Sequence, residues 1–179
     1  MEIKIRAATQ ADAATIAHIQ VDTWRASYGT IVPKTYLAGL SYDDSERFWW
    51  DLLSGSATGC VFVAEDKGGV IGFASGRPRG NFSKGLTDYK GVLDTLYVLP
   101  SHQGASAGRR LIAAVTEYFL GLDIESMLLW VFAENRAARG FYESLGGVLV
   151  AEDGFEIGGA WVSEVAYGWR DVSVLAEDV

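Results

Sequence analysis

Three patterns follow one another in LDTLYVLPSHQGASAGRRLIAAV, residues Leu93–Val115. An apolar run typical of a strand reaches Pro100, the small-residue segment QGASAG follows, and a helical pattern then opens with Arg109 and Arg110. The N-terminus of a helix presents backbone N–H groups and the positive end of the helix dipole, and small side chains let an anion reach them. These residues therefore predict a phosphate-binding loop between a strand and a helix.

This loop differs from two common phosphate-binding motifs. A Walker A loop requires Gly-Lys-Ser/Thr at its end, and the dinucleotide fingerprint requires Gly-x-Gly-x-x-Gly, and the segment QGASAG fits neither. A nucleotide-phosphate binder is therefore a weaker hypothesis. From the loop alone, a merely flexible connection also stays open.

The composition indicates a globular protein with an acidic surface. Of 179 residues, 49% are hydrophobic and 21% are charged, and 15 Lys and Arg stand against 23 Asp and Glu, for a formal net charge of -8. This balance argues against a nucleic-acid partner, because such affinity depends on cationic contacts to phosphate. It suits a cationic small molecule, although an acidic solubilising surface is the simpler explanation.

The chain carries few signals for a location outside the cytoplasm. Cys60 is the only cysteine, which excludes an internal disulfide and a cysteine-rich metal site. The first residues have no apolar signal-peptide core, and no apolar run is long enough to span a bilayer. We therefore expect a cytoplasmic protein with no bound metal and no membrane contact, built as a single domain over residues 1–179.

Strand and helix patterns alternate along the chain in the order βαα-ββ-βα-βα-ββ, which predicts a mixed α/β fold. Helices are expected after the capping pair Thr9/Asp12, after Ser41, after the QGASAG loop and after Asn135. A polar, glycine-rich loop is expected over 77–91. Strands are expected at 3–7, 60–66, 70–77, 92–98, 127–133, 147–153 and 161–170.

Two motifs together resemble the GNAT superfamily of N-acetyltransferases. QGASAG at Gln103–Gly108, preceded by LYVLP, resembles the family's acyl-CoA pyrophosphate loop Gln/Arg-x-x-Gly-x-Gly/Ala. NRAARGFYESLGG at Asn135–Gly147 resembles its second motif, and IRAATQADAATIAHIQVDTWRASY is similar to the N-terminal strand and helix of bacterial members. The resemblance spans nearly the whole chain. It implies a central, twisted, mostly antiparallel sheet of about seven strands flanked by about four helices, with acetyl-CoA as acyl donor and a primary amine, on a small molecule or a peptide, as acceptor.

The resemblance also implies a role for each matching residue. The loop would surround the pyrophosphate with backbone N–H groups, the strand around Tyr97 would pair with the pantetheine arm, and Tyr142 would lie near the thioester sulfur. Without the resemblance, Asn135 is simply a helix N-cap, and Phe141 and Tyr142 are core residues. The implied acetyl-CoA-binding residues are Leu96, Tyr97, Val98, Gln103, Gly104, Ala105, Ser106, Ala107, Gly108, Arg109, Asn135 and Phe141.

Three positions depart from the family pattern, and one of them, Val148 after Gly147 in place of the usual Phe, is a packing change. Ser106 stands where the loop has glycine, so it is strained if the site requires a positive φ, and otherwise its hydroxyl could bind phosphate. Val92 stands where many members carry a strand glutamate that deprotonates the amine. Asp94 follows two residues later, on the same face, and is our candidate base, with Glu65 a weaker one and a water chain a further alternative.

Tyr142 is the candidate acid for the leaving thiolate, because a phenol with a pKa near ~10 stays protonated at neutral pH. Aromatic residues beside acids could hold a cationic acceptor, although some of them are expected in the core. The aromatic residues are Trp24, Tyr28, Trp49 and Trp50, and the acids are Asp22 and Asp43. A non-catalytic acyl-CoA-binding or sensory domain is the alternative function, favoured by Val92, and whether the protein forms a homodimer stays open.

Overall fold

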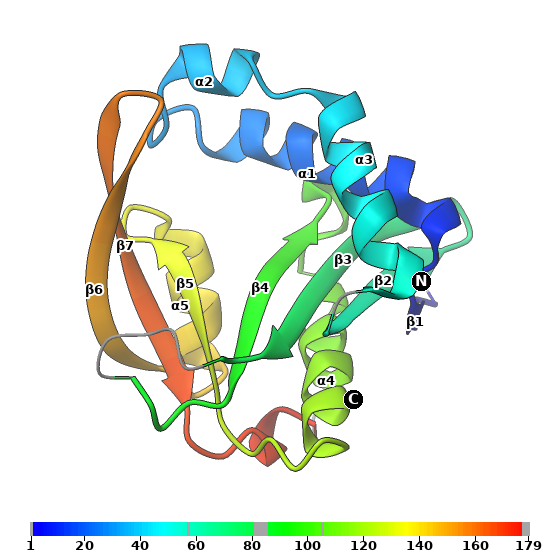
Figure 1. The fold of residues 1–179 in the computed structure, drawn as a ribbon, viewed down its shortest axis with the longest axis vertical. Helices are drawn as coiled ribbons and strands as arrows, with labels where there is room; N and C mark the ends of the chain where they lie inside the picture. The colour runs from blue at the N-terminus through cyan, green and yellow to red at the C-terminus, as the bar shows by residue number, and fades with distance from the viewer. Residues whose placement is uncertain (1, 57, 81–85, 105, 177–179) are drawn as a thin grey trace.

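A seven-stranded sheet forms the centre of the protein, in the order β1-β2-β3-β4-β5-β7-β6 (Figure 1). This computed structural model describes residues 2–56, 58–80, 86–104 and 106–176. Neighbouring strands are antiparallel, except that β4 and β5 run parallel. The strands are β1 (Lys4–Ala7), β2 (Cys60–Asp66), β3 (Gly69–Pro78), β4 (Gly91–Val98), β5 (Met127–Phe132), β6 (Val148–Ile157) and β7 (Ala160–Trp169).

Helices cover both faces of this sheet (Figure 1). One apolar core joins α4 and α5 to one face, and two smaller cores join α1, α2 and α3 to the other. No helix among the described residues is both long and apolar enough to cross a bilayer. The helices are α1 (Ala13–Ser27), α2 (Lys34–Ala38), α3 (Tyr42–Asp51), α4 (Ala107–Leu120) and α5 (Arg136–Ser144).

The predicted fold class is confirmed, with one helix more than the four expected. The additional helix, α2, begins directly after Pro33, where the sequence pattern predicted only a break. It spans little more than one turn and buries only Leu37, which is too short for a periodic apolar pattern to be recognised. Part of the predicted polar loop, at 81–85, lies outside the described residues.

The sheet opens between β4 and β5. Their parallel ladder consists of two residue pairs, Gly91 with Met127 and Val92 with Leu128, although the strands continue for several residues beyond it. Each strand stays paired along its other side, β4 with β3 and β5 with β7. The facing edges of β4 and β5 therefore diverge into a wedge.

A β-bulge in β4 changes which face of the sheet its side chains point to. Ser75 of β3 pairs with Thr95 and Gly76 with Leu93, so Asp94 is the extra residue. Leu93 and Leu96 both pack against the α4 side, three residues apart instead of the two or four of a regular strand. Such bulges re-aim side chains, and this one lies beside the opening of the sheet.

An ion-paired carboxylate fixes the start of the N-terminal helical segment. Asp12 accepts a hydrogen bond from the Thr9 backbone N–H at 2.8 Å and two from the Arg6 guanidinium, each at 2.8 Å. The predicted pairing of Thr9 with Asp12 is thus confirmed, although a 3-10 turn at Gln10–Asp12 precedes α1. The hydrogen bonds from Arg6 lower the pKa of the Asp12 carboxyl from 3.8 to about 2.

We expect Asp12→Asn to lower the melting temperature at neutral pH by on the order of 5 °C, because it removes the ion pair between Asp12 and Arg6. A carboxyl whose pKa is lowered in the folded state stabilises the fold above its ordinary pKa of 3.8, and this contribution disappears as pH falls towards about 2. The difference between Asp12→Asn and wild type should therefore shrink with falling pH in thermal melts followed by circular dichroism. Asp44→Asn is the control, because its pair with Arg47 is 73–75% exposed. An equal loss in the control would contradict this assignment.

Candidate active site

A cavity of about 980 Å³ occupies the wedge between β4 and β5. Its lining comes from both strands, from the start of α4 and from α5 on one face of the sheet, and from α1 on the other face. Phe155 of β6 and Glu164 of β7 complete it. Along β4 the cavity reaches from Leu93 to Val98. Among the described residues, the edge of β4 that faces β5 has no β-strand partner after Val92. Backbone N–H and C=O groups on an open edge require partners, so this edge can bind an extended ligand as an added strand.

The predicted phosphate loop lies at one end of this cavity. Gly104 and Ser106 both have positive φ, +78° and +66°, and α4 begins at Ala107. A Cβ atom at Gly104 would meet nothing within 4 Å, so the backbone there is accessible. The side chain of Gln103 donates to the Val98 carbonyl at 3.1 Å, which ties the loop to the end of β4. Ala105 lies outside the described residues.

The Ser106 backbone decides between the two possibilities that the sequence left open. It adopts the left-handed conformation that favours glycine, so the serine is strained, as expected for a position where the loop pattern has glycine. Its carbonyl still accepts the first backbone hydrogen bond of α4, from Arg110 at 3.0 Å. Serine therefore takes a glycine-type backbone conformation at this position, at a conformational cost.

Gly108 has a packing role that the sequence did not indicate. A Cβ atom there would lie 3.3 Å from Cζ of Phe141, which means that glycine lets α5 approach the first turn of α4. Both residues line the cavity, as does Arg109. Most of the predicted cofactor-binding residues thus line this one cavity, and Ala107, which is buried at the start of α4, does not.

Three tyrosines contribute hydroxyl groups to the site. Tyr28, Tyr97 and Tyr142 line the cavity, and burial raises the pKa of each phenol above 10. The Tyr97 hydroxyl accepts a hydrogen bond from Trp24 Nε1 at 2.8 Å. Asn135 is the predicted N-cap of α5, accepting from the Ala138 N–H at 3.2 Å, and it also lines the cavity. All three phenols remain neutral hydrogen-bonding groups at physiological pH.

Asp94, the candidate base, is held by an ion pair. Its carboxylate lies 3.0 Å from Nε of Arg77, which pairs in register with Val92. Cross-strand partners share a face, so the Arg77 and Val92 side chains lie on the same face of the sheet. Because Asp94 contacts Arg77, its side chain lies on that face too, as the spacing predicted. Burial raises the pKa of Asp94 above 3.8, and the Arg77 charge acts in the opposite direction.

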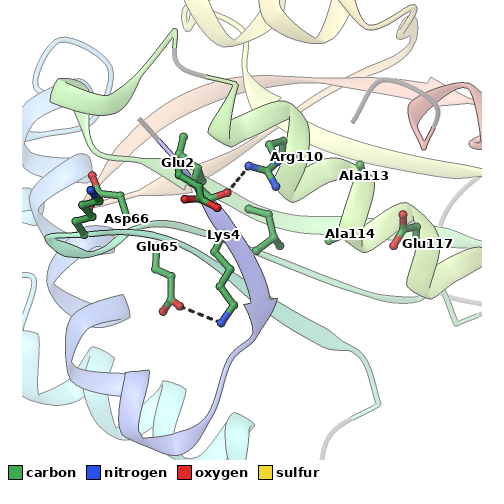
Figure 2. A pocket seen from close by; sticks show the side chains of 11 residues that line it. Glu2, Lys4, Glu65, Asp66, Arg110, Ala113, Ala114 and Glu117 are labelled. Atoms are coloured by element: carbon green, nitrogen blue, oxygen red, sulfur yellow. Dashed lines mark hydrogen bonds and ion pairs between the residues drawn. The ribbon is translucent and has the colours of Figure 1, made fainter.

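Glu65, the weaker candidate base, lies in a different cavity of about 580 Å³, formed by β1, the end of β2 and α4 (Figure 2). Its carboxylate contacts Arg6 at 2.8 Å and Lys4 at 3.8 Å. On the opposite wall, Arg110 donates to the Ile3 carbonyl. The charges of this second cavity are of both signs, and Glu65 is ion-paired with Lys4 and Arg6, so we assign no chemistry to it.

Glu164 is a cavity residue that the sequence reasoning missed. It lies on β7, where it pairs directly with Phe132 of β5 and with Asp153 of β6. Its carboxyl is half-buried, and burial, followed by the charge of Asp153, raises its pKa above 4.5. The sequence does contain a sign of this residue, because Glu164 is the only charge in the alternating series Val162, Glu164, Ala166. Val162 and Ala166 are both buried.

Only part of the expected aromatic wall lines the cavity. Trp24 and Tyr28 do, and the Phe132 ring packs edge-on to both, with centroid separations of 5.8 and 4.9 Å. Trp49 is buried against Phe73 in the core beneath α1 and α3, away from the cavity lining. The remaining members, which also lie outside the cavity lining, are Trp50, Asp22 and Asp43.

A profile of the acetyltransferase (GNAT) family matches residues 16–147. The chain belongs to the GNAT family. It is 40% identical over 174 residues to the uncharacterized N-acetyltransferase YuaI of Bacillus subtilis, a match that covers 97% of this chain and 96% of that relative. It is 26% identical over 151 residues to the L-amino acid N-acyltransferase MnaT of Escherichia coli, covering 84% and 82% of the two chains.

Solved structures of GNAT proteins share the fold. The structure of yncA from Salmonella typhimurium, with its cofactor acetyl-CoA, superposes with a TM-score of 0.69 at 22% identity, over 94% of each chain. Family membership confirms the prediction of an acetyl-CoA-dependent acyltransferase with acetyl-CoA as co-substrate. The cavity fits that co-substrate, because it combines an open strand edge with a helix N-terminus approached through residues of small volume.

We expect Ser106→Gly to fold at least as stably as wild type, because glycine adopts φ = +66° without the steric cost borne by serine. Ser106→Val should instead lose about 1–2 kcal/mol, since a β-branched side chain is least tolerated at positive φ. Denaturant unfolding of the three proteins measures the difference. Equal stability of the glycine and valine variants would contradict the left-handed conformation.

Proposed function

We propose that this GNAT-family chain transfers the acetyl group of acetyl-CoA to a primary amine, by direct attack of the amine in a ternary complex. One observation supports this proposal most directly: a single cavity contains the open edge of β4, the α4 N-terminus and the buried Tyr142 side chain with its hydroxyl group. A binding module would need the first two features alone. The third supports catalysis, because a neutral hydroxyl group beside the reacting atoms can donate a proton.

The loop end of the cavity would bind the phosphates of acetyl-CoA. Backbone N–H groups of the first turn of α4 have no acceptor within the helix, and the dipole adds positive charge there. Gly104 leaves the backbone uncovered, and the Arg109 side chain adds a positive charge. The open edge of β4, from Leu96 to Val98, would then pair with the amide groups of the pantetheine arm.

Acetyl-CoA supplies the thioester that the amine attacks, and the protein would handle the protons. Asp94 would accept the proton of the ammonium group, directly or through water. We call the face of the sheet that α1 and α2 cover the acceptor face, because the amine would approach Asp94 from there. A backbone N–H of the Leu96–Val98 segment would polarise the carbonyl oxygen. Tyr142 would donate to the departing thiolate, which would be costly to leave unpaired in this buried site.

Direct attack is favoured over an acyl-enzyme because the described cavity lining offers no activated nucleophile. Cys60 lies outside it, and burial raises the pKa of its thiol to about 12. The hydroxyl of Ser101 lies 2.8 Å from Nδ1 of His102, but Ser101 is exposed and does not line the cavity.

The alternative is a non-catalytic acyl-CoA sensor. Val92 in place of a strand glutamate favours it, and the ion pair of Asp94 with Arg77 makes that carboxylate a weaker base. Turnover with an amine separates the two hypotheses, since a sensor binds acetyl-CoA without releasing CoA. The acceptor panel should include α-amino acids, because MnaT is named for them.

For the loop, we expect calorimetric titration to show micromolar binding of acetyl-CoA and weaker binding of its 3′-dephospho form. Gly108→Glu should weaken binding by about 100-fold or more, because it introduces a carboxylate where the phosphates would lie. Gly108→Ala is the matched control and should stay within a few-fold, since its Cβ atom requires only a small shift of the Phe141 ring. Undiminished binding by Gly108→Glu would refute the assignment of the loop.

For the acid, we expect Tyr142→Phe to lower kcat by about 10²-fold while leaving the Kd for acetyl-CoA unchanged. Phenylalanine keeps the packing against Trp169 and Tyr167, so thermal melts should match wild type. Stopped-flow detection of the released CoA thiol measures kcat. A variant with full kcat would exclude Tyr142 as the acid.

For the base, we expect Asp94→Asn to lower kcat/KM by about 10²-fold and to shift the acid limb of its pH profile to higher pH. The shift has this direction because, without the base, the reaction depends on the fraction of amine that is already neutral in solution. Arg77→Gln tests the ion pair separately. Its loss should raise the pKa of Asp94 further and so move the acid limb upward as well, with a smaller loss of rate. An unchanged profile in Asp94→Asn would assign the base elsewhere.

A further inference from the structure

We infer that the acceptor is a cationic amine with an aromatic or aliphatic body and no carboxylate next to the reacting nitrogen, and that Glu164 selects for this class. The inference rests on the proposed function and narrows it. It separates simple amines from α-amino acids, which carry the same ammonium group beside a carboxylate.

The first observation is the position of Glu164. Its direct pairing with Phe132 puts both side chains on one face of the sheet, the face covered by α1 and α2. Phe132 contacts Trp24 and Tyr28 on this face. The loop and Arg109 belong to α4, which packs on the opposite face. Glu164 therefore lies at the acceptor end of the cavity, away from the phosphate end.

The second observation is the charge of that end. The two ionisable carboxyls lining the cavity are Asp94 and Glu164, both reached from the acceptor face. Asp153 of β6, next to Glu164, adds a third negative charge on the same face. Arg77 lies outside the cavity lining and is paired with Asp94. Among the described lining residues of this end, then, no cation is available for a substrate carboxylate.

The third observation is the apolar surface beside these carboxyls. Phe132 stacks on Phe155 of β6 with a centroid separation of 6.3 Å, and it packs in T-shaped contacts against Trp24 and Tyr28. Aromatic faces next to acids favour an organic cation, because the ring quadrupole and the carboxylate both attract it. They offer nothing to a second anionic group, which would also be repelled by Asp94 and Glu164.

Glu164 is thus a specificity residue for the ammonium group, distinct from the proton transfer that we assign to Asp94. A half-buried carboxylate beside a second acid is unfavourable on its own, as its raised pKa reflects. A bound ammonium group would relieve that cost, and a bound α-carboxylate would add to it.

The test uses pairs of acceptors that differ only in the α-carboxylate: phenethylamine with phenylalanine, tyramine with tyrosine, and isoamylamine with leucine. At saturating acetyl-CoA, we expect kcat/KM for each amine to exceed that for its amino acid by about 10-fold or more. Phenylalaninamide keeps the bulk of the carboxylate without its charge, and it should behave like the amine. Amino acids used as well as their amines would overturn the inference and leave the proposed function intact.

Glu164→Gln should reduce this preference by about 10-fold, mainly through a higher KM for the amines. Glu156→Gln is the matched control, since it makes the same change at an exposed position of β6 outside the cavity lining, and it should keep the wild-type preference. Thermal melts establish that both variants fold. An unchanged preference in Glu164→Gln would remove Glu164 from acceptor selection. Binding of acetyl-CoA with no acetylation of any acceptor would overturn both the inference and the proposed transfer.

Discussion

The separation of β4 from β5 is the constraint on which the rest of the site depends. A parallel pair is the natural place for it, because the two strands end at the same edge and each leads into a loop and a helix. Each strand is held on its outer side by an antiparallel neighbour, so the sheet can open in the middle without losing either half. The cost is two strand edges whose backbone groups lack strand partners. A ligand with its own amide groups removes that cost when it binds.

Opening the sheet also connects its two faces. The predicted phosphate loop belongs to the α4 and α5 side, whereas Trp24, Phe132 and Glu164 belong to the side of α1 and α2. In an intact sheet, ligands on these two sides could not touch. Through the wedge, a donor approaching from one side and an acceptor approaching from the other can meet between β4 and β5, where Tyr142 and the β4 bulge lie.

Local signals made the fold and the local structure around the two family motifs predictable. The strand, loop and helix around QGASAG, the Asn135 cap and the second motif each depend on residues close together in sequence, and each has the predicted position in the structure. Non-local features were harder to recognise. Glu164 contributes to the cavity only because β7 inserts between β5 and β6, and no pattern within β7 reveals that order. Likewise, the pairing of Asp94 with Arg77 depends on the register of β3 against β4.

The distribution of charge explains why two carboxyls and three phenols can occupy one site without conflict. Burial raises the pKa of Tyr28, Tyr97 and Tyr142, so all three stay uncharged at physiological pH. The carboxyls are then the groups of the acceptor end that carry charge, and Arg77 balances only Asp94. An unbalanced negative charge in a partly buried cavity favours a cation as its occupant. The same charge that attracts an ammonium group also stabilises its protonated form, which is unreactive, so the transfer that we propose requires a base, the role that we propose for Asp94.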